Sequence, residues 1–119
     1  MPSSESIPRP ELRVVEKPWG REEWLSVGER IVLKRLILLA GHRFSLQYHE
    51  KKEEVWLFVK GRARVRFGDA EETIGPGDVI HVPVGTIHRI EAIEDIELIE
   101  ASTPELTDVV RVEDDFGRS

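Results

Sequence analysis

The stretch Lys60-Gly61-Arg62-Ala63-Arg64-Val65-Arg66-Phe67-Gly68-Asp69 contains a turn, a strand and a second turn. Its apolar residues Ala63, Val65 and Phe67 alternate with arginines, which is the period of a strand with one face buried and the other in water. The glycines at both ends supply the backbone conformations that tight turns need. The stretch therefore predicts a half-buried β-strand between two turns.

Similar short runs continue along the chain in both directions. They are rich in β-branched and aromatic residues, turns containing glycine or proline separate them, and no long helical period interrupts them. We expect strands over residues 12–15, 21–27, 30–39, 44–49, 54–59, 63–67, 71–74, 78–82, 88–92, 96–101 and 109–112. Antiparallel strands without helices must form a sandwich or a barrel to hide their edges. The sequence therefore predicts an all-β fold, a small jelly-roll barrel.

The 119 residues of the chain fit one domain. Residues 1–10 hold three prolines and three serines, and they carry too little apolar surface to offset the entropy lost on ordering. We expect a flexible lead-in over residues 1–10 and a single domain over residues 11–119.

Charge and composition exclude several classes of protein. The net charge of −6 disfavours binding to nucleic acid, which depends on positive side chains at the phosphates. The chain has no cysteine, so a metal ion would need histidine, carboxylate or amide ligands. The apolar run at residues 36–40 is far too short to span a bilayer, and residues 1–6 lack the pattern of a secretory signal. We expect a cytoplasmic protein that binds neither nucleic acid nor membranes.

Metal-ligating residue types gather in two places. Gln47 and His49 lie two residues apart, so they project from the same face of a strand, and Glu54 follows across the polar turn 50–52. A hairpin would bring these three side chains together. His88 alternates with apolar residues on its strand, which directs its ring inward. A single inward histidine is most often a core residue with satisfied hydrogen bonds, but four donors in two clusters favour a metal site.

The spacing of these residues resembles the two motifs of the cupin superfamily. The first reads Gly41-X5-Gln47-X-His49-X4-Glu54-X6-Gly61, and the second reads Gly77-X5-Pro83-X-Gly85-X2-His88. Within the cupins the chain is most similar to the C-terminal domain of type II mannose-6-phosphate isomerases, here as a stand-alone cupin. That similarity rests on Lys17-Pro18-Trp19-Gly20, Ser45-Leu46-Gln47-X-His49, Glu54-X-Trp56, Ile87-His88-Arg89 and Asp114-Asp115-Phe116-Gly117-Arg118.

The resemblance implies a divalent metal, with zinc favoured over iron, manganese or nickel, and the ligands Gln47, His49, Glu54 and His88. It also implies a sugar-phosphate isomerase of the mannose-6-phosphate type. Moving a proton between C1 and C2 of a sugar requires stabilisation of an enediolate, which a metal ion provides as a Lewis acid. Four places depart from the family pattern, and they leave substrate handling open: Lys52, Val55, Ala92 and residues 106–107.

Two assignments remain open in the sequence: the carboxylate ligand and the role of the tryptophans. Glu53 also lies within the spacing that a cupin tolerates, but it points to the opposite face from Glu54, and we favour Glu54. Trp19, Trp24 and Trp56 suit either sugar stacking or the core of so small a domain, and we favour the core.

Three residues are candidates for the remaining catalytic work. Glu100 shares a face with apolar neighbours and is a candidate base, although an acid at a strand end is also ordinary. His81 is a candidate second proton carrier, although an exposed histidine beside a proline turn is equally ordinary. Lys34, like Arg43, is a candidate cation for a phosphate group.

Other functions compete with the isomerase. An iron-dependent dioxygenase would use two histidines and one carboxylate, and a cupin that only binds a sugar or small molecule would need no base. The partner that we expect is a small-molecule substrate, a sugar phosphate in the first place. Long apolar strands such as residues 31–39 also predict a homodimer.

Overall fold

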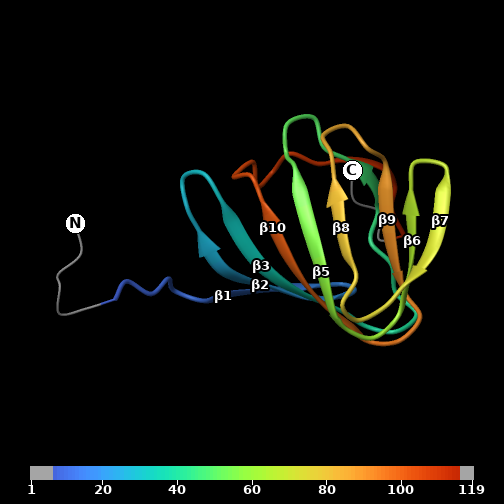
Figure 1. The fold of residues 1–119 in the computed structure, drawn as a ribbon, viewed down its shortest axis with the longest axis horizontal. Coiled ribbons are helices and arrows are strands. Elements are labelled where there is room, and N and C mark those ends of the chain that lie inside the picture. The colour runs from blue at the N-terminus through green and yellow to red at the C-terminus, as the bar shows by residue number, and fades with distance from the viewer. Residues whose placement is uncertain (1–6, 116–119) are drawn as a thin grey trace.

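The computed structural model describes residues 7–115. Within them the chain forms eleven strands and no helix (Figure 1), which confirms the all-β prediction. The strands are β1 (Arg13–Lys17), β2 (Gly20–Val27), β3 (Val32–Leu38), β4 (Leu46–Tyr48), β5 (Glu54–Lys60), β6 (Ala63–Phe67), β7 (Ala70–Ile74), β8 (Val79–Val82), β9 (His88–Ala92), β10 (Ile96–Ser102) and β11 (Val110–Glu113). Part of the expected lead-in and of the C-terminal motif, residues 1–6 and 116–118, lies outside the described residues.

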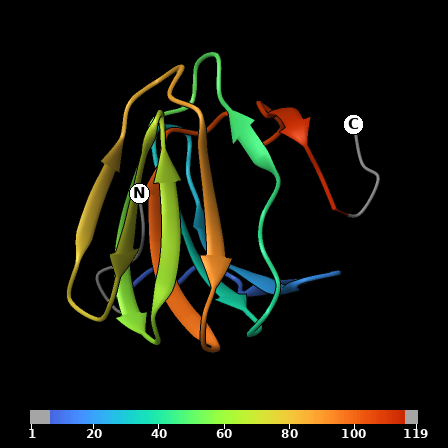
Figure 2. The same cartoon turned by 90° about the vertical axis from the view of Figure 1, so that its right-hand side faces the viewer.

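The strands form two antiparallel sheets. The six-stranded sheet has the order β1-β2-β3-β10-β5-β8, and the five-stranded sheet has the order β11-β4-β9-β6-β7. In Figure 1 the six-stranded sheet runs from β1 on the left to β8, and β9, β6 and β7 lie to the right. Figure 2 shows red β11 beside green β4.

The predicted jelly roll is present, and its two sheets do not close into a barrel. Among the described residues, no strand pairing joins the two sheets at β7 and β8. These strands are consecutive, but the turn between them carries the chain from one sheet to the other. Gly77 in that turn has a φ of 90°, a value that glycine adopts without strain.

The core lies between the inner faces of the two sheets. Alternation puts Leu36 and Leu38 of β3, Phe58 of β5 and Leu98 of β10 into it, each at most 6% exposed. Trp19 and Trp56 are also buried, as predicted, whereas Trp24 is half-buried. The apolar core fills one part of the space between the sheets and leaves the other part to polar side chains.

The predicted hairpin between the first three candidate ligands is wrong. Strand β4 pairs with β11 and β9 in the five-stranded sheet, whereas β5 pairs with β10 and β8 in the six-stranded sheet. The loop over residues 49–53 therefore crosses from one sheet to the other. Both segments direct the candidate ligands inward, so the ligands meet across the sandwich and not along one ladder.

Candidate metal centre

A polar cavity of about 160 Å³ lies between the sheets. The five-stranded sheet contributes Gln47 and His49 at β4 and His88 at the start of β9, and the six-stranded sheet contributes Glu54 of β5 and Glu100 of β10. The alternation of each strand turns these side chains away from solvent. Residues that are far apart in the sequence thus line a single site.

Three of the predicted ligands form a compact cluster. One ligand atom each from His49, Glu54 and His88 lies within 4.8 Å of the others, and all three residues are at most 3% exposed. His49 Nε2 lies 2.6 Å from Glu54 Oε2, and the two imidazole centres are 5.1 Å apart. Two histidines and a carboxylate are donors that suit a divalent transition metal.

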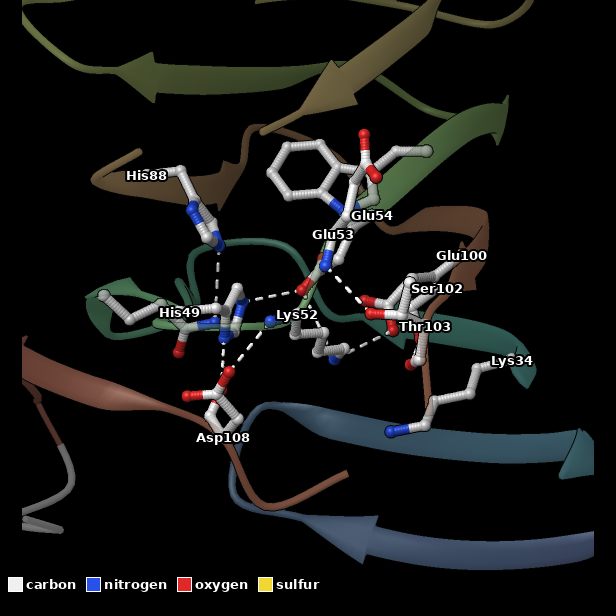
Figure 3. Close-up of polar contacts among 12 residues, drawn as sticks. Lys34, His49, Lys52, Glu53, Glu54, His88, Glu100, Ser102, Thr103 and Asp108 are labelled. Carbon is white, nitrogen blue, oxygen red and sulfur yellow. Dashed lines mark hydrogen bonds and ion pairs between the residues drawn. The ribbon is translucent and has the colours of Figure 1, made fainter. Parts of the chain in front are cut away.

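Backbone carbonyls fix both rings so that Nε2 faces the cluster. His49 Nδ1 lies 2.5 Å from the Asp108 carbonyl oxygen (Figure 3), and His88 Nδ1 lies 2.9 Å from the Thr86 carbonyl oxygen. A carbonyl oxygen only accepts hydrogen bonds, so each Nδ1 donates and each neutral ring presents the Nε2 lone pair to the site. This second-layer support is typical of metal-binding histidines.

The donor atoms fit a divalent cation. His49 Nε2 is buried and has no hydrogen-bond partner in an acceptable direction, although the Glu54 carboxylate lies beside it. Burial lowers the pKa of His49, but the neighbouring Glu54 carboxylate raises it more, so the net shift is upward. Burial also lowers the pKa of His88 and keeps this ring in the neutral form that binds metals.

Glu54 is held as a carboxylate. Burial alone would raise its pKa, but the close contact with His49 and the charge of Lys52 hold the pKa well below the ordinary value. The Trp56 indole N–H donates to Glu54 Oε1 over 2.7 Å, which leaves Oε2 toward His49. The structure therefore directs Glu54, and not Glu53, into the site, as we favoured.

Gln47 lies beside the cluster with its amide turned the other way. The Ser45 hydroxyl donates to Gln47 Oε1 over 2.6 Å, and Gln47 Nε2 lies 3.5 Å from His88 Nε2. An amide N–H donates hydrogen bonds and does not bind a cation. Gln47 would become the fourth ligand through Oε1 after its amide rotates.

A buried acid and a buried lysine adjoin the cluster. Burial and the charge of Glu54 raise the pKa of Glu100 to about 7. Lys52 Nζ lies 3.4 Å from Glu100 Oε2 and 3.3 Å from Glu54 Oε2, and Lys52 is only 6% exposed. In the sequence, Lys52 stands out only as a departure from the family pattern and not as a residue of the site. Its position two residues before Glu54 was the available signal.

The far part of the cavity carries a second ion pair. Lys34 of β3 is buried, and its Nζ lies 3.1 Å from Glu22 Oε1 and 4.7 Å from the Trp24 ring centre. Burial raises the pKa of Glu22 and the charge of Lys34 lowers it. The net result is a Glu22 pKa below the ordinary value. Lys34 thus faces the cavity, but it already has a carboxylate partner.

Two other candidates lie outside the cavity. His81 is on the outer face of β8, where its Nε2 contacts Glu53 Oε2, and both side chains are at least half exposed. Arg43 binds Asp115 through two hydrogen bonds of 2.7 and 2.8 Å. The structure therefore does not bring either residue to the metal-ligand cluster, and we leave both out of the proposed site.

Comparison with known families and proteins identifies relatives of this chain. The mannose-6-phosphate isomerase C-terminal family model matches residues 9–114. The mannose-1-phosphate guanylyltransferase ManC of Salmonella typhimurium is 35% identical over 111 residues, which are 89% of this chain and 23% of that protein. XanB, a xanthan biosynthesis protein of Xanthomonas campestris, is 33% identical over 112 residues, which are 90% of this chain and 24% of that protein. The chain spans about a quarter of the length of these relatives.

Solved structures confirm the cupin jelly roll. An RmlC-like cupin from Shewanella frigidimarina superposes with a TM-score of 0.75 at 16% identity, over 82% of this chain and 87% of that one. KdgF from Halomonas sp. gives a TM-score of 0.72 at 20% identity, over 80% of this chain and 88% of that one. No helix in residues 7–115 is long and apolar enough to cross a membrane.

Proposed function

The chain belongs to the mannose-6-phosphate isomerase C-terminal family, and from this membership and the cavity we propose that it is a metal-dependent isomerase of a sugar phosphate. The observation that carries the proposal is the pair of buried imidazoles that each place a ring nitrogen within 4.8 Å of a Glu54 carboxylate oxygen, with a second acid of raised pKa beside them. We propose that His49, Glu54, His88 and Gln47 hold the ion. Zinc is favoured, and when bound it supplies Lewis-acid polarisation of a carbonyl oxygen.

Glu100 is the proposed proton carrier. An aldose–ketose conversion moves one proton from C2 to C1 and one from the C2 hydroxyl to the C1 oxygen, so it needs no oxidant. A carboxyl with a pKa of about 7 is present in both forms near neutral pH, and it can accept the C2 proton and return it to C1. Lys52, which contacts Glu54 and Glu100, balances the charge on both acids.

Lys34 is proposed to bind the substrate at the far part of the cavity. It would share its ammonium between Glu22 and a substrate oxygen, because three N–H donors are available on one lysine. Trp24 limits the space above Lys34 and offers a face for the apolar side of a sugar. Lys34 therefore acts as a binding group, not as the group that moves the C2 proton.

The dioxygenase remains a second candidate because of one observation. His49, Glu54 and His88 alone form the set of two histidines and one carboxylate that holds iron in oxygenases. Glu100 separates the two functions, since iron–oxygen chemistry does not require a carboxyl of raised pKa beside the metal ligands. We therefore place the isomerase first.

We also propose a homodimer through the outer face of the six-stranded sheet. Apolar residues of neighbouring strands adjoin each other there: Leu33 and Val55 flank Ala101, and Leu57 lies between Ile99 and Val79. Side chains of both charges flank this patch. Arg35 pairs with Glu97 on one side, and His81 pairs with Glu53 on the other. A flat patch with an apolar centre and mixed charges at its rim is self-complementary under a two-fold axis, which fits a second copy of the chain.

Metal analysis and an isomerase assay on the same samples test the proposed function. The full chain and its His49→Ala and His88→Ala variants would be assayed by elemental analysis and by NMR of mannose 6-phosphate in D₂O. We expect one zinc ion per wild-type chain, appearance of fructose 6-phosphate with deuterium at C1, and loss of both in the two variants. Bound iron with oxygen uptake and no isomerisation would favour the dioxygenase. No binding of any divalent ion, even after reloading, would overturn the metal site.

A further inference from the structure

One segment of the chain, residues 103–109, holds the loop that carries the metal ligands. At one end of this loop, the Thr103 N–H donates to the Glu53 carbonyl oxygen over 3.1 Å, and the Glu53 N–H donates to Thr103 Oγ1 over 3.0 Å. At the other end, Asp108 contacts the residues that follow β4. The loop over residues 49–53 thus has no strand partner, but it is tied at both ends.

Asp108 makes four hydrogen bonds to consecutive loop residues. Its carboxylate accepts the backbone N–H groups of Glu50, Lys51 and Lys52 over 3.1, 2.6 and 2.8 Å, and its carbonyl oxygen accepts His49 Nδ1–H. Figure 3 shows Asp108 below His49, on the side away from His88. One residue therefore contacts both the ring of a proposed ligand and the backbone behind it.

These contacts hold both the backbone and the imidazole ring of His49 in place. The Asp108 side chain fixes the loop backbone relative to the 103–109 segment, and the Asp108 carbonyl then fixes the imidazole relative to that backbone. The direction of His49 Nε2 follows from both. Lys52 lies in the same loop, so the position of its ammonium between Glu54 and Glu100 depends on the same anchor.

We propose that Asp108 is a positioning residue of the metal centre, whose carboxylate orients His49 and Lys52 and so raises the affinity for a divalent cation. The inference rests on the proposed function only in that the cluster binds a cation. Outer-layer partners of metal ligands typically change metal affinity by about 10- to 100-fold. The effect reaches the ion through His49, and Asp108 itself does not touch it.

Calorimetric titration with Zn²⁺ alone tests this role on the full chain after removal of metal with a chelator. Asp108→Asn keeps the size of the side chain and the backbone carbonyl, but its NH₂ group cannot accept the loop N–H groups. We expect Zn²⁺ to bind this variant about 10- to 100-fold more weakly than the wild type. Asp108→Ala should show at least the same loss. Asp69→Asn is the matched control, because Asp69 is exposed in the turn between β6 and β7, and it should bind Zn²⁺ like the wild type.

Thr103→Val separates positioning from general loosening of the loop. It removes the hydroxyl that anchors Glu53 and leaves His49 Nδ1 bonded, so we expect a change in Zn²⁺ affinity of no more than about threefold. Equal losses in Thr103→Val and Asp108→Asn would overturn the proposal, as would wild-type affinity in an Asp108→Asn variant that melts at the wild-type temperature. Absence of Zn²⁺ binding by the wild type would instead contradict the proposed metal site itself.

Discussion

The two faces of the six-stranded sheet differ in a way that reverses the usual pattern. The inner face buries charged side chains, and the outer face exposes apolar ones. The inner set includes Lys34, Glu54 and Glu100, and the outer set includes Leu33, Val55 and Leu57 of the same or adjoining strands. Buried charges without partners are costly, and exposed apolar patches are rare on monomers. This difference supports the two proposals that the inner face binds a ligand and that the outer face contacts a second copy of the chain.

Replacing the inner-face acid Glu100 gives the largest expected effect on activity. Glu100→Gln keeps the shape of the side chain and removes the proton carrier, so kcat should fall by about 10²- to 10⁴-fold. The pKa of about 7 for Glu100 predicts that wild-type activity rises with pH through neutrality, because the base must be ionised. Steady-state kinetics from pH 5 to pH 9 measure both. A full-rate Glu100→Gln enzyme with the same pH profile would remove Glu100 from the mechanism.

A charge on the outer face should separate the two copies. Leu57→Lys places an ammonium at the centre of the apolar patch, where two such groups would face each other across the two-fold axis. We expect the mass in solution to fall from that of a dimer to that of a monomer, with Zn²⁺ binding unchanged. Analytical ultracentrifugation measures the mass. Thr73→Lys on the exposed face of β7 is the control and should remain a dimer; a wild-type monomer would refute the proposed interface.

The buried charge of Glu100 should also lower stability in a defined pH range. Its pKa is about 7 in the folded protein against an ordinary value of 4.5, so the folded state retains a proton that the unfolded state loses between these values. The free energy of unfolding of the metal-free protein should therefore fall as pH rises from 4.5 to 7, by roughly 3 kcal/mol. Urea unfolding of the wild type and Glu100→Gln measures this. A fall of the same size in the variant would assign it to other groups.

Replacing His81 on the outer face should have the smallest effect on stability, activity and Zn²⁺ binding. His81→Ala breaks the contact with Glu53, and both side chains are at least half exposed. Exposed pairs contribute about 1 kcal/mol or less, so the melting temperature, kcat and Zn²⁺ affinity should all stay close to the wild-type values. A loss of activity on the scale of Glu100→Gln would return His81 to the list of proton carriers.

The sequence predicts the strands, the shared face of Gln47 and His49 and the inward direction of His88, because alternation within one strand is a local property. It predicts the wrong path between His49 and Glu54, because a short polar loop can join strands of one sheet or of two. It does not place Lys52 in the site, because Glu54 of β5 and Glu100 of β10 come together around Lys52 only in the folded chain. Asp108 lies 59 residues from His49, so only the folded chain brings its carboxylate to the loop.

Substitutions of Glu53 and Glu54 test whether the inner face of the six-stranded sheet holds a metal ion. These neighbours have the same side chain, but Glu53 contacts His81 outside and Glu54 contacts His49 inside. Calorimetric titration with Zn²⁺ would compare the wild type, Glu53→Gln and Glu54→Gln. We predict one bound ion per chain, unchanged affinity in Glu53→Gln and a loss of about 100-fold or more in Glu54→Gln. Equal binding by both variants would contradict the account.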